Sequence, residues 1–295
     1  MTEVLWHDLE CGGYADDLPL WRELAGAGPV LDVGCGTGRV ALDLAARGAR
    51  RARRRAGVVR VTSVGVIWHD LECGGYADDL PLWRELAGNG PVLDVGCGTG
   101  RVALDLAARG VPVVGLDRDA ELLAALSERA GDLPVEVVRA DARDFDLGRT
   151  FPVVLAPMQT VQLLGGAEQR AAFLRCARAH LDPGGLLALA LADALEGFDE
   201  TTATPPLPDV HEQDGIVYFS QPVAMKDERT RVAIHRVREV VDRDGARTTG
   251  RDVVRLDRVM PAELESEAAG FTVLERRAIP ASDEFVGSAV VMLRA

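Results

Sequence analysis

The stretch GPVLDVGCGTGRVALDLAARG occurs twice in this chain, at residues 28–48 and again at residues 90–110. In each copy a short apolar run leads into a glycine-rich turn, and the turn leads into apolar residues at helical spacing. This order predicts a buried β-strand, a tight turn and an amphipathic helix, which is the start of a parallel α/β unit. Such a turn usually wraps a nucleotide-like cofactor. The chain could therefore bind two cofactors, one or none.

The repeat extends beyond the glycine-rich turn, because residues 4–48 match residues 66–110 at nearly every position. The two differences are Leu5 against Ile67 and Ala27 against Asn89. Structural repeats that stack normally recur at least three times and drift in sequence. Two near-identical copies instead indicate an internal duplication of a gene segment, or an error in the reading of the gene. Only the second copy continues into another apolar run that ends in an acid, VPVVGLD at 111–117, so we expect the second copy to form the complete domain.

The segment between the copies, ARRARRRAGVVRVTSVG at 49–65, concentrates arginines. One interpretation is a nucleic-acid or targeting patch. The other is a solvated linker, which we favour because no aromatic residues interleave the arginines and the whole chain carries a net charge of −13. That charge would repel nucleic-acid backbones and anionic membranes at long range. The expected partner is a small-molecule substrate, with neither nucleic acid nor membrane.

Targeting signals and metal-ligand spacings are absent from the sequence. It has no run of about 18 apolar residues, and MTEVLWHDLE lacks the features of a signal peptide, so we expect a cytoplasmic protein. Two pairs among the five cysteines are copies of each other, and no C-x-x-C spacing occurs, so we expect reduced thiols and no metal site.

From residue 78 onward the pattern alternates regularly between strands and helices. We expect helices at 78–88, 99–110, 119–130, 167–181 and 260–271, and strands at 91–96, 112–116, 134–139, 151–156, 185–191, 272–279 and 287–295. Continuous apolar strands alternating with helices predict a Rossmann-like α/β fold, with a doubly wound, mostly parallel sheet. The two closing strands follow a short connection, which predicts an antiparallel last strand.

A segment of different character interrupts this alternation. Residues 201–210 are rich in proline, and the residues after them alternate like antiparallel strands, with DRDG at 242–245 as a hairpin turn. We divide the chain into a partial duplicate with its linker at 1–65, a core formed by 66–195 and 256–295, and an inserted antiparallel segment at 196–255. We expect the insertion to lie over the carboxyl edge of the parallel sheet, as a lid or as the surface of a homodimer.

The glycine spacing distinguishes between cofactors. A dinucleotide fingerprint G-x-G-x-x-G that starts at Gly96 needs glycine at position 101, where the chain has Arg101. The chain has Gly96, Gly98 and Gly100, hence G-x-G-x-G, and it has no G-K-[ST] of a P-loop. A nicotinamide-dependent oxidoreductase is therefore a weak alternative.

The set formed by VLDVGCGTG, the acid Asp117 after VVGL, and ADARDF at 140–145 resembles the class I S-adenosylmethionine-dependent methyltransferases. The resemblance implies S-adenosylmethionine as cofactor, with Asp94 placing its methionine end, Asp117 accepting hydrogen bonds from both ribose hydroxyls, and Asp141 with Ala142 holding the adenine amino group. It also implies that Tyr76 lies near the sulfonium. The expected cofactor-binding residues are Tyr76, Asp94, Gly96, Cys97, Gly98, Gly100, Asp117, Arg118, Asp141, Ala142 and Pro157.

The methyl acceptor is less constrained. The loop after the strand at 151–156 reads APMQT instead of the [DN]-P-P-[YF] signature of enzymes that methylate base amides, so the resemblance disfavours that class. Substrate candidates are Trp68, Gln159, His211 and Tyr218, with His69 and His235 as further polar groups. In-line methyl transfer depends on positioning and desolvation, so no catalytic base is assigned. We interpret His180, near a helix end, as a partner of the helix dipole.

These observations lead to a hypothesis and its alternatives. The chain is expected to be an S-adenosylmethionine-dependent methyltransferase that transfers a methyl group to a small-molecule acceptor by direct in-line displacement, with one cofactor site built from the second copy. The first alternative is a methyltransferase-like binding module without turnover, and the second is the oxidoreductase.

Overall fold

The computed structural model describes residues 17–25, 62–192, 195, 198, 205–282 and 285–295. The chain divides into two units, Met1–Val61 and Thr62–Ala295, which are described separately. In the first unit the described element is helix α2, Leu18–Ala25, whose sequence LPLWRELA recurs as helix α5, Leu80–Ala87, in the second unit. The rest of the first copy lies outside the described residues, whereas residues 64 and 65, predicted as linker, begin helix α4, Val64–His69, of the second unit. No helix of the described segments is long and apolar enough to span a membrane.

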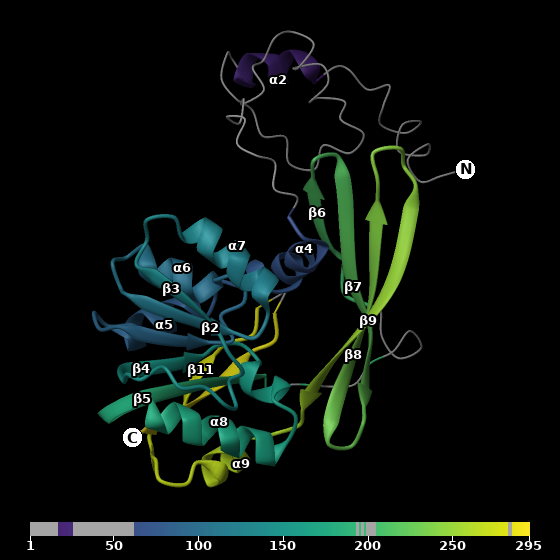
Figure 1. Ribbon diagram of the computed structural model, residues 1–295. Helices are drawn as coiled ribbons and strands as arrows, with labels where there is room; N and C mark the ends of the chain where they lie inside the picture. Colours follow the sequence, from purple (N-terminus) through teal and green to yellow (C-terminus); the bar gives the residue numbers. More distant parts are fainter. Residues whose placement is uncertain (1–16, 26–61, 193–194, 196–197, 199–204, 283–284) are drawn as a thin grey trace. The chain divides into compact units, whose positions relative to one another are not determined.

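The second unit is built on one large, mostly parallel sheet (Figure 1). Its neighbouring strands run in the order β10, β12, β5, β4, β1, β2 and β3, with β11 also paired to β12. Their bounds are β1 Val92–Val95, β2 Val113–Asp117, β3 Val135–Arg139, β4 Phe151–Ala156, β5 Leu181–Ala192, β10 Thr272–Val273, β11 Arg277–Ile279 and β12 Ser288–Arg294. Strands β1 to β5 pair in parallel and β12 pairs antiparallel with β5, as the sequence predicted.

Helices cover both faces of this sheet, which is why its central strands can be apolar throughout. Figure 1 shows α6 and α7 on one side, and α8 and α9 on the other. Their bounds are α4 Val64–His69, α6 Arg101–Ala107, α7 Ala120–Ala130, α8 Ala167–Ala179 and α9 Pro261–Glu267, with short helical turns η2 Asp70–Gly74 and η3 Thr160–Leu163. Side chains of β1 alternate between two buried clusters: Val92 belongs to one with α5 and α6, and Leu93 and Val95 belong to the other with α8. Asp94 therefore points, with Val92, toward the α5 and α6 side.

A second, four-stranded antiparallel sheet follows β5 in sequence, in the order β6, β7, β8 and β9. Its strands are β6 Asp209–Gln213, β7 Ile216–Asp227, β8 Arg231–Val241 and β9 Arg247–Asp257. The predicted DRDG turn joins β8 to β9, where the Gly245 N–H donates to the carbonyl of Asp242. This sheet touches the η2 and η3 segments, which flank the glycine-rich turn and the loop after β4 respectively.

Several predicted element bounds were wrong. The strand expected over 272–279 is broken into β10 and β11, whose pairing with β12 stops after Val273 and resumes at Arg277; between them the Leu274 N–H still donates to the carbonyl of Met292. The helix expected to reach residue 271 ends at Glu267. Strand β4 does begin at Phe151, but its register against β5 shifts between Phe151 and Val153, on either side of Pro152, which has no N–H to donate.

Candidate functional site

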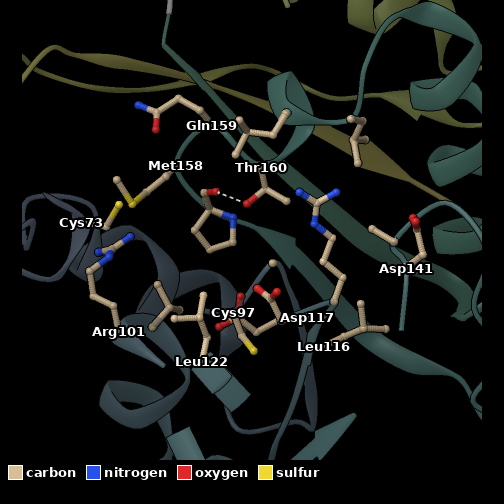
Figure 2. Close-up of a pocket in the computed structure, with 18 of the residues that line it drawn as sticks. Cys73, Cys97, Arg101, Leu116, Asp117, Leu122, Asp141, Met158, Gln159 and Thr160 are labelled. Atoms are coloured by element: carbon tan, nitrogen blue, oxygen red, sulfur yellow. Dashed lines mark hydrogen bonds between the residues drawn. The ribbon is translucent and has the colours of Figure 1, made fainter. Parts of the chain in front are cut away.

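A cavity of about 340 Å³ lies at the carboxyl edge of the parallel strands, where the glycine-rich turn follows β1. This volume is within the range of pockets for small ligands. Of the predicted residues, Asp94, Gly96, Cys97, Asp117, Arg118, Asp141, Ala142, Pro157 and Gln159 line it. Figure 2 shows Asp117, Asp141, Gln159 and Arg101 around this space, on segments far apart in the sequence. The fold thus gathers the ends of β1, β2, β3 and β4, as ligand sites in open α/β sheets require.

The glycine-rich turn is shaped by residues that close on it from two sides. Gly96 has φ +74°, and a Cβ there would lie 2.6 Å from Thr160 Cγ2. Gly98 has φ +53°, and a Cβ there would lie 2.4 Å from His69 Nε2. Side chains at these positions would be strained and would also occupy the cradle between the turn and its neighbours. Side chains of this chain, from Thr160 and His69, therefore pack directly against the backbone of the turn.

Asp94 is the most unusual group in the cavity. Its side chain is 1% exposed, and neither carboxylate oxygen completes a hydrogen bond with the described residues, although the nearby Ala103 N–H lowers its pKa slightly. Burial raises the pKa of Asp94 to about 7, and the carboxylates of Asp117 and Asp79 add to the rise while Arg101 opposes it. A buried acceptor without a partner is costly, so a cationic ligand in the cavity would relieve that cost. The residues therefore fit a ligand that carries an ammonium group.

Asp117 ends β2 and faces the same space. Its Oδ2 accepts a hydrogen bond from the Gly98 N–H at 3.0 Å, and its Oδ1 accepts one from the Asp119 N–H at 2.9 Å. A carboxylate has about four acceptor sites, so two remain for hydroxyl donors of a ligand. Its two backbone bonds fix the carboxylate in place while leaving it able to bind a diol.

Asp141 lies beyond β3 with both oxygens engaged. Arg143 donates to it from Nε at 2.8 Å and from its second terminal nitrogen at 2.5 Å, and this hydrogen bonding lowers the pKa of Asp141 to about 2. Arg143 and Ala142 line the cavity beside it. The carboxylate is thus permanently charged, with its remaining lone pairs and the adjacent backbone available to a ligand amino group.

Arg101, which sequence reasoning used only to exclude a dinucleotide, is part of the cavity wall. It forms a bidentate ion pair with the buried Asp79, with N···O distances of 2.5 and 2.7 Å, and it donates to the carbonyl of Tyr76 at 2.9 Å. The sequence offers Asp78 or Asp79 as the cap of α5. Asp79 stands at that position, but its side chain makes no capping bond because it is bound to Arg101.

The loop after β4 supplies the opposite wall. Met158 adopts φ +54°, an uncommon conformation for a residue with a side chain, and such strain concentrates at functional sites. Thr160 Oγ1 donates to the carbonyl of Pro157 at 2.9 Å, the bond drawn in Figure 2. The buried side chain of Gln162 bonds both the N–H and the carbonyl of Ala192, which ties this loop to the end of β5.

The segment α4–η2 closes over the glycine-rich turn from the other side. His69 and Cys73 line the cavity. Glu72 joins this segment to the second sheet: Arg238 donates to both its oxygens at 2.8 and 2.9 Å, and Ser220 Oγ donates at 2.7 Å. Burial alone would raise the pKa of Glu72, but these hydrogen bonds outweigh burial and hold it below its usual value.

The other predicted residues lie elsewhere. Tyr76 is buried in the core, with its ring 4.9 Å from that of Phe285 and the Arg101 guanidinium over its face. Trp68 and Tyr218 pack edge to face at 5.4 Å, which joins α4 to β7. Of the remaining candidates, His211 lies on β6 with its ring 6.5 Å from Tyr218, and His235 lies on β8.

His180 stands at the end of α8, as predicted, and its Nδ1 lies 2.8 Å from the carbonyl of Cys176 in the last turn of that helix. A ring N–H bonded to this carbonyl fits the predicted partner of the helix dipole. Its Nε2 also accepts the Leu147 N–H at 2.9 Å, a bond that the sequence did not predict. Its buried ring, 4.5 Å from Phe145, serves packing and local hydrogen bonding.

Sequence reasoning missed Arg101, Arg143, Met158 and Thr160 as cavity residues. Arg143 follows two positions after Asp141, and a cation so close to a predicted ligand acid is a signal that could have been used. The loop residues carry no comparable signal, because their place depends on how the loop folds back over Gly96.

Residues 92–185 match the family model described as "Methyltransferase domain". The Cypemycin N-terminal methyltransferase of a Streptomyces species is 38% identical over 120 residues, which cover 39% of this chain and 49% of that protein. The dTDP-3-amino-3,6-dideoxy-alpha-D-glucopyranose N,N-dimethyltransferase of Streptomyces fradiae is 35% identical over 96 residues, 32% of this chain and 37% of that protein. This chain thus spans about half, or less, of the length of these curated relatives.

Among solved structures, the CcbJ methyltransferase of Streptomyces caelestis superposes with a TM-score of 0.58 at 27% identity. The superposition covers 75% of this chain and 91% of that one, so it includes far more than the segment matched by the family model. The predicted Rossmann-like fold with an antiparallel last strand, and the predicted resemblance to methyltransferases, are thereby confirmed.

Proposed function

We propose that the chain transfers a methyl group from S-adenosylmethionine to an amine nitrogen of a small molecule, through the domain whose residues 92–185 match the methyltransferase family model. The observation that carries the proposal is the buried, unpartnered carboxylate of Asp94 in a cavity formed around G-x-G-x-G. A cofactor with an ammonium group and no phosphate suits this chemistry, whereas a dinucleotide would bring a pyrophosphate close to Asp94.

Each acid has a distinct task in this proposal. Asp94 binds the ammonium group of the methionine end, Asp117 accepts from the ribose hydroxyls, and Asp141 with the backbone of Ala142 binds the adenine amino group. Arg101, only 11% exposed in its side chain and paired to Asp79, adds positive charge at the methionine end and suits a carboxylate. When bound, the cofactor supplies an electrophilic methyl group on a sulfonium sulfur. The chain positions the acceptor in line with that group and excludes water.

Nitrogen is favoured as the accepting atom by the names of the curated relatives. One is named for methylation of a peptide N-terminus and the other for dimethylation of an amino sugar. Both acceptors carry a primary amine, although the molecules that bear it differ greatly. The wall opposite the glycine-rich turn, formed by Met158, Gln159 and Leu163, is neutral and would favour an uncharged amine, the form with a nucleophilic lone pair.

The proposal is tested in two steps. Calorimetric titration of S-adenosylhomocysteine should give one site per chain, since only the second copy is followed by Asp117. Two sites would show that the first copy also completes a site. Methyl transfer is then measured with a dTDP-3-amino sugar and with a short peptide that has a free N-terminus, and the same two compounds with acetylated amines serve as matched controls. Methylated product from a free amine alone supports the proposal. Tight S-adenosylhomocysteine binding combined with methylation of the acetylated controls would refute an amine as acceptor.

A further inference from the structure

His69 sits at the junction of α4 and η2 and lines the cavity, with 28% of its side chain exposed. Its Nδ1 lies 3.3 Å from Thr99 Oγ1. Thr99 Oγ1 donates its own proton to Asp70 Oδ1 at 2.7 Å. Because a hydroxyl has a single proton, Thr99 can only accept from the imidazole. This fixes the neutral ring with its proton on Nδ1 and a lone pair on Nε2.

Asp70, which orients Thr99, is itself bound by a residue of another helix. Arg129 on α7 donates to both oxygens of Asp70, at 3.0 and 2.5 Å. Burial alone would raise the pKa of Asp70, but hydrogen bonds from His69, Arg129 and Thr99 outweigh burial and hold the pKa well below its usual value. Asp70 therefore remains an acceptor across the physiological pH range. The chain of contacts Arg129–Asp70–Thr99–His69 joins α7, η2, the glycine-rich turn and α4.

The other ring nitrogen of His69 lies beside the glycine-rich turn. A Cβ at Gly98 would stand 2.4 Å from His69 Nε2, so the ring packs against the Gly98 backbone. No hydrogen bond of the described residues reaches Nε2. The absence of a side chain at position 98 thus leaves room for the imidazole in the wall of the cavity.

The other titratable groups of the cavity wall are already committed. Asp94 is the acceptor for an ammonium group, and Asp117 holds the turn through the Gly98 and Asp119 N–H groups. Asp141 is paired to Arg143. Burial raises the pKa of Cys73 to about 11, so its thiol keeps its proton at neutral pH. His69 thus offers the described cavity wall an imidazole that can accept a proton, which the amide of Gln159 and the hydroxyl of Thr160 do far less readily.

We propose that His69 is the proton acceptor of methyl transfer, with Thr99 and Asp70 as positioning residues; this inference rests on the proposed function. The lone pair of the neutral amine forms the N–C bond as the C–S bond breaks, and the C–S electron pair goes to sulfur. The nitrogen becomes positively charged as this bond forms, and His69 Nε2 accepts its proton in the same step and later releases it to solvent. Proton removal regenerates a neutral amine, which a second methylation requires.

The duplication provides a matched control for the test. His7 stands in the same sequence, WHDLECGGY, as His69. With an amine that wild type methylates, His69→Gln should lower kcat by about 10²- to 10⁴-fold, the usual contribution of a general base. The dissociation constant of S-adenosylhomocysteine should stay within about threefold, which corresponds to about 0.7 kcal/mol of binding free energy. His7→Gln should leave kcat unchanged. Added imidazole should partly restore His69→Ala, which a merely structural role would not allow.

A second measurement does not depend on turnover. The chain has five histidines, and a long-range ¹H–¹⁵N correlation spectrum of the full chain, assigned with His69→Gln, reports which nitrogen of His69 carries the proton. We expect protonated Nδ1, and loss of this preference in Thr99→Val but not in Thr99→Ser. A ring protonated on Nε2 in neutral wild type, or unchanged kcat in His69→Gln, would overturn the inference. Absence of amine methylation by wild type would instead refute the proposed function, and the spectrum would still test the orientation of His69.

Discussion

Replacing Asp94 with asparagine should strengthen the folded state at alkaline pH while it weakens cofactor binding. Burial raises the pKa of Asp94 from 3.8 to about 7 in the folded chain. A folded pKa above the unfolded one means that the folded state holds the proton more tightly, so stability falls as pH rises from about 4 through 7. At 1.36 kcal/mol per pKa unit, the full penalty above pH 7 is about 4 kcal/mol, of which about 3 kcal/mol develops between pH 5 and pH 8.

The assay compares free energies of unfolding at these two pH values. Urea denaturation can be followed by tryptophan fluorescence, since Trp83 is fully buried in the same core cluster that Val92 of β1 joins. The advantage of Asp94→Asn over wild type should grow by about 3 kcal/mol from pH 5 to pH 8. Burying an amide also costs free energy, which shifts the stability of Asp94→Asn equally at both pH values. The test therefore uses the change of the stability difference between pH 5 and pH 8, and not the difference at one pH. Asp32→Asn, the same substitution in the first copy, should show no such growth.

Binding provides the second arm of the test. Loss of a hydrogen bond to a charged group costs about 1.5–3 kcal/mol, so Asp94→Asn should weaken S-adenosylhomocysteine binding about 10- to 100-fold. Wild-type affinity should fall as pH drops below about 7, because Asp94 must lose its proton before it pairs with the ammonium group. An Asp94→Asn protein with wild-type affinity, or with the same pH dependence of stability as wild type, would refute the reasoning.

Three further substitutions test other parts of the site. Asp117→Ala should reduce S-adenosylhomocysteine affinity at least 100-fold in calorimetry, since it removes an acceptor for two hydroxyls and also releases the Gly98 N–H; retained affinity would contradict its assignment. Gly98→Ala should lower both stability and affinity, because its φ of +53° and the contact with His69 leave no room for a Cβ, while Gly36→Ala in the first copy should retain cofactor affinity. Glu72→Gln should lower the free energy of unfolding by about 1–3 kcal/mol by leaving Arg238 incompletely paired, and an unchanged urea midpoint would show that this ion pair contributes nothing.

Much of the cofactor end could be predicted from the sequence. The residues Asp94, Gly96 and Asp117 lie at strand ends or in a turn, and strand ends of a parallel sheet meet at one edge whatever the helices do. Order of elements and direction of the last strand followed from local apolar patterns and from connection lengths. Local sequence also determines the helix LPLWRELA, which forms both as α2 and as α5.

The positions of the residues expected near the methyl acceptor could not be predicted without the tertiary structure. Tyr76 and Trp68 are aromatic residues of the kind that often contact ligands, yet Tyr76 packs on Phe285 and Trp68 on Tyr218. A large aromatic ring stabilises the fold more when it is buried in a core than when it lies on a surface. The contact of His69 with Thr99, 30 residues further along the chain, exists only because α4 packs beside the glycine-rich turn, so the sequence alone could not predict it.

The sequence by itself determined the sheet and the acids that line the cavity at its edge, and the tertiary structure decided which polar groups have partners. Local periodicity and turn chemistry act over a few residues, so they can be read directly along the chain. The partner of a charge can lie far away in sequence, as Arg129 does from Asp70 and Arg238 from Glu72. Whether a carboxylate is paired, as Asp79 is by Arg101, or left without a partner for a ligand, as Asp94 is, depends on distances that only the folded chain sets.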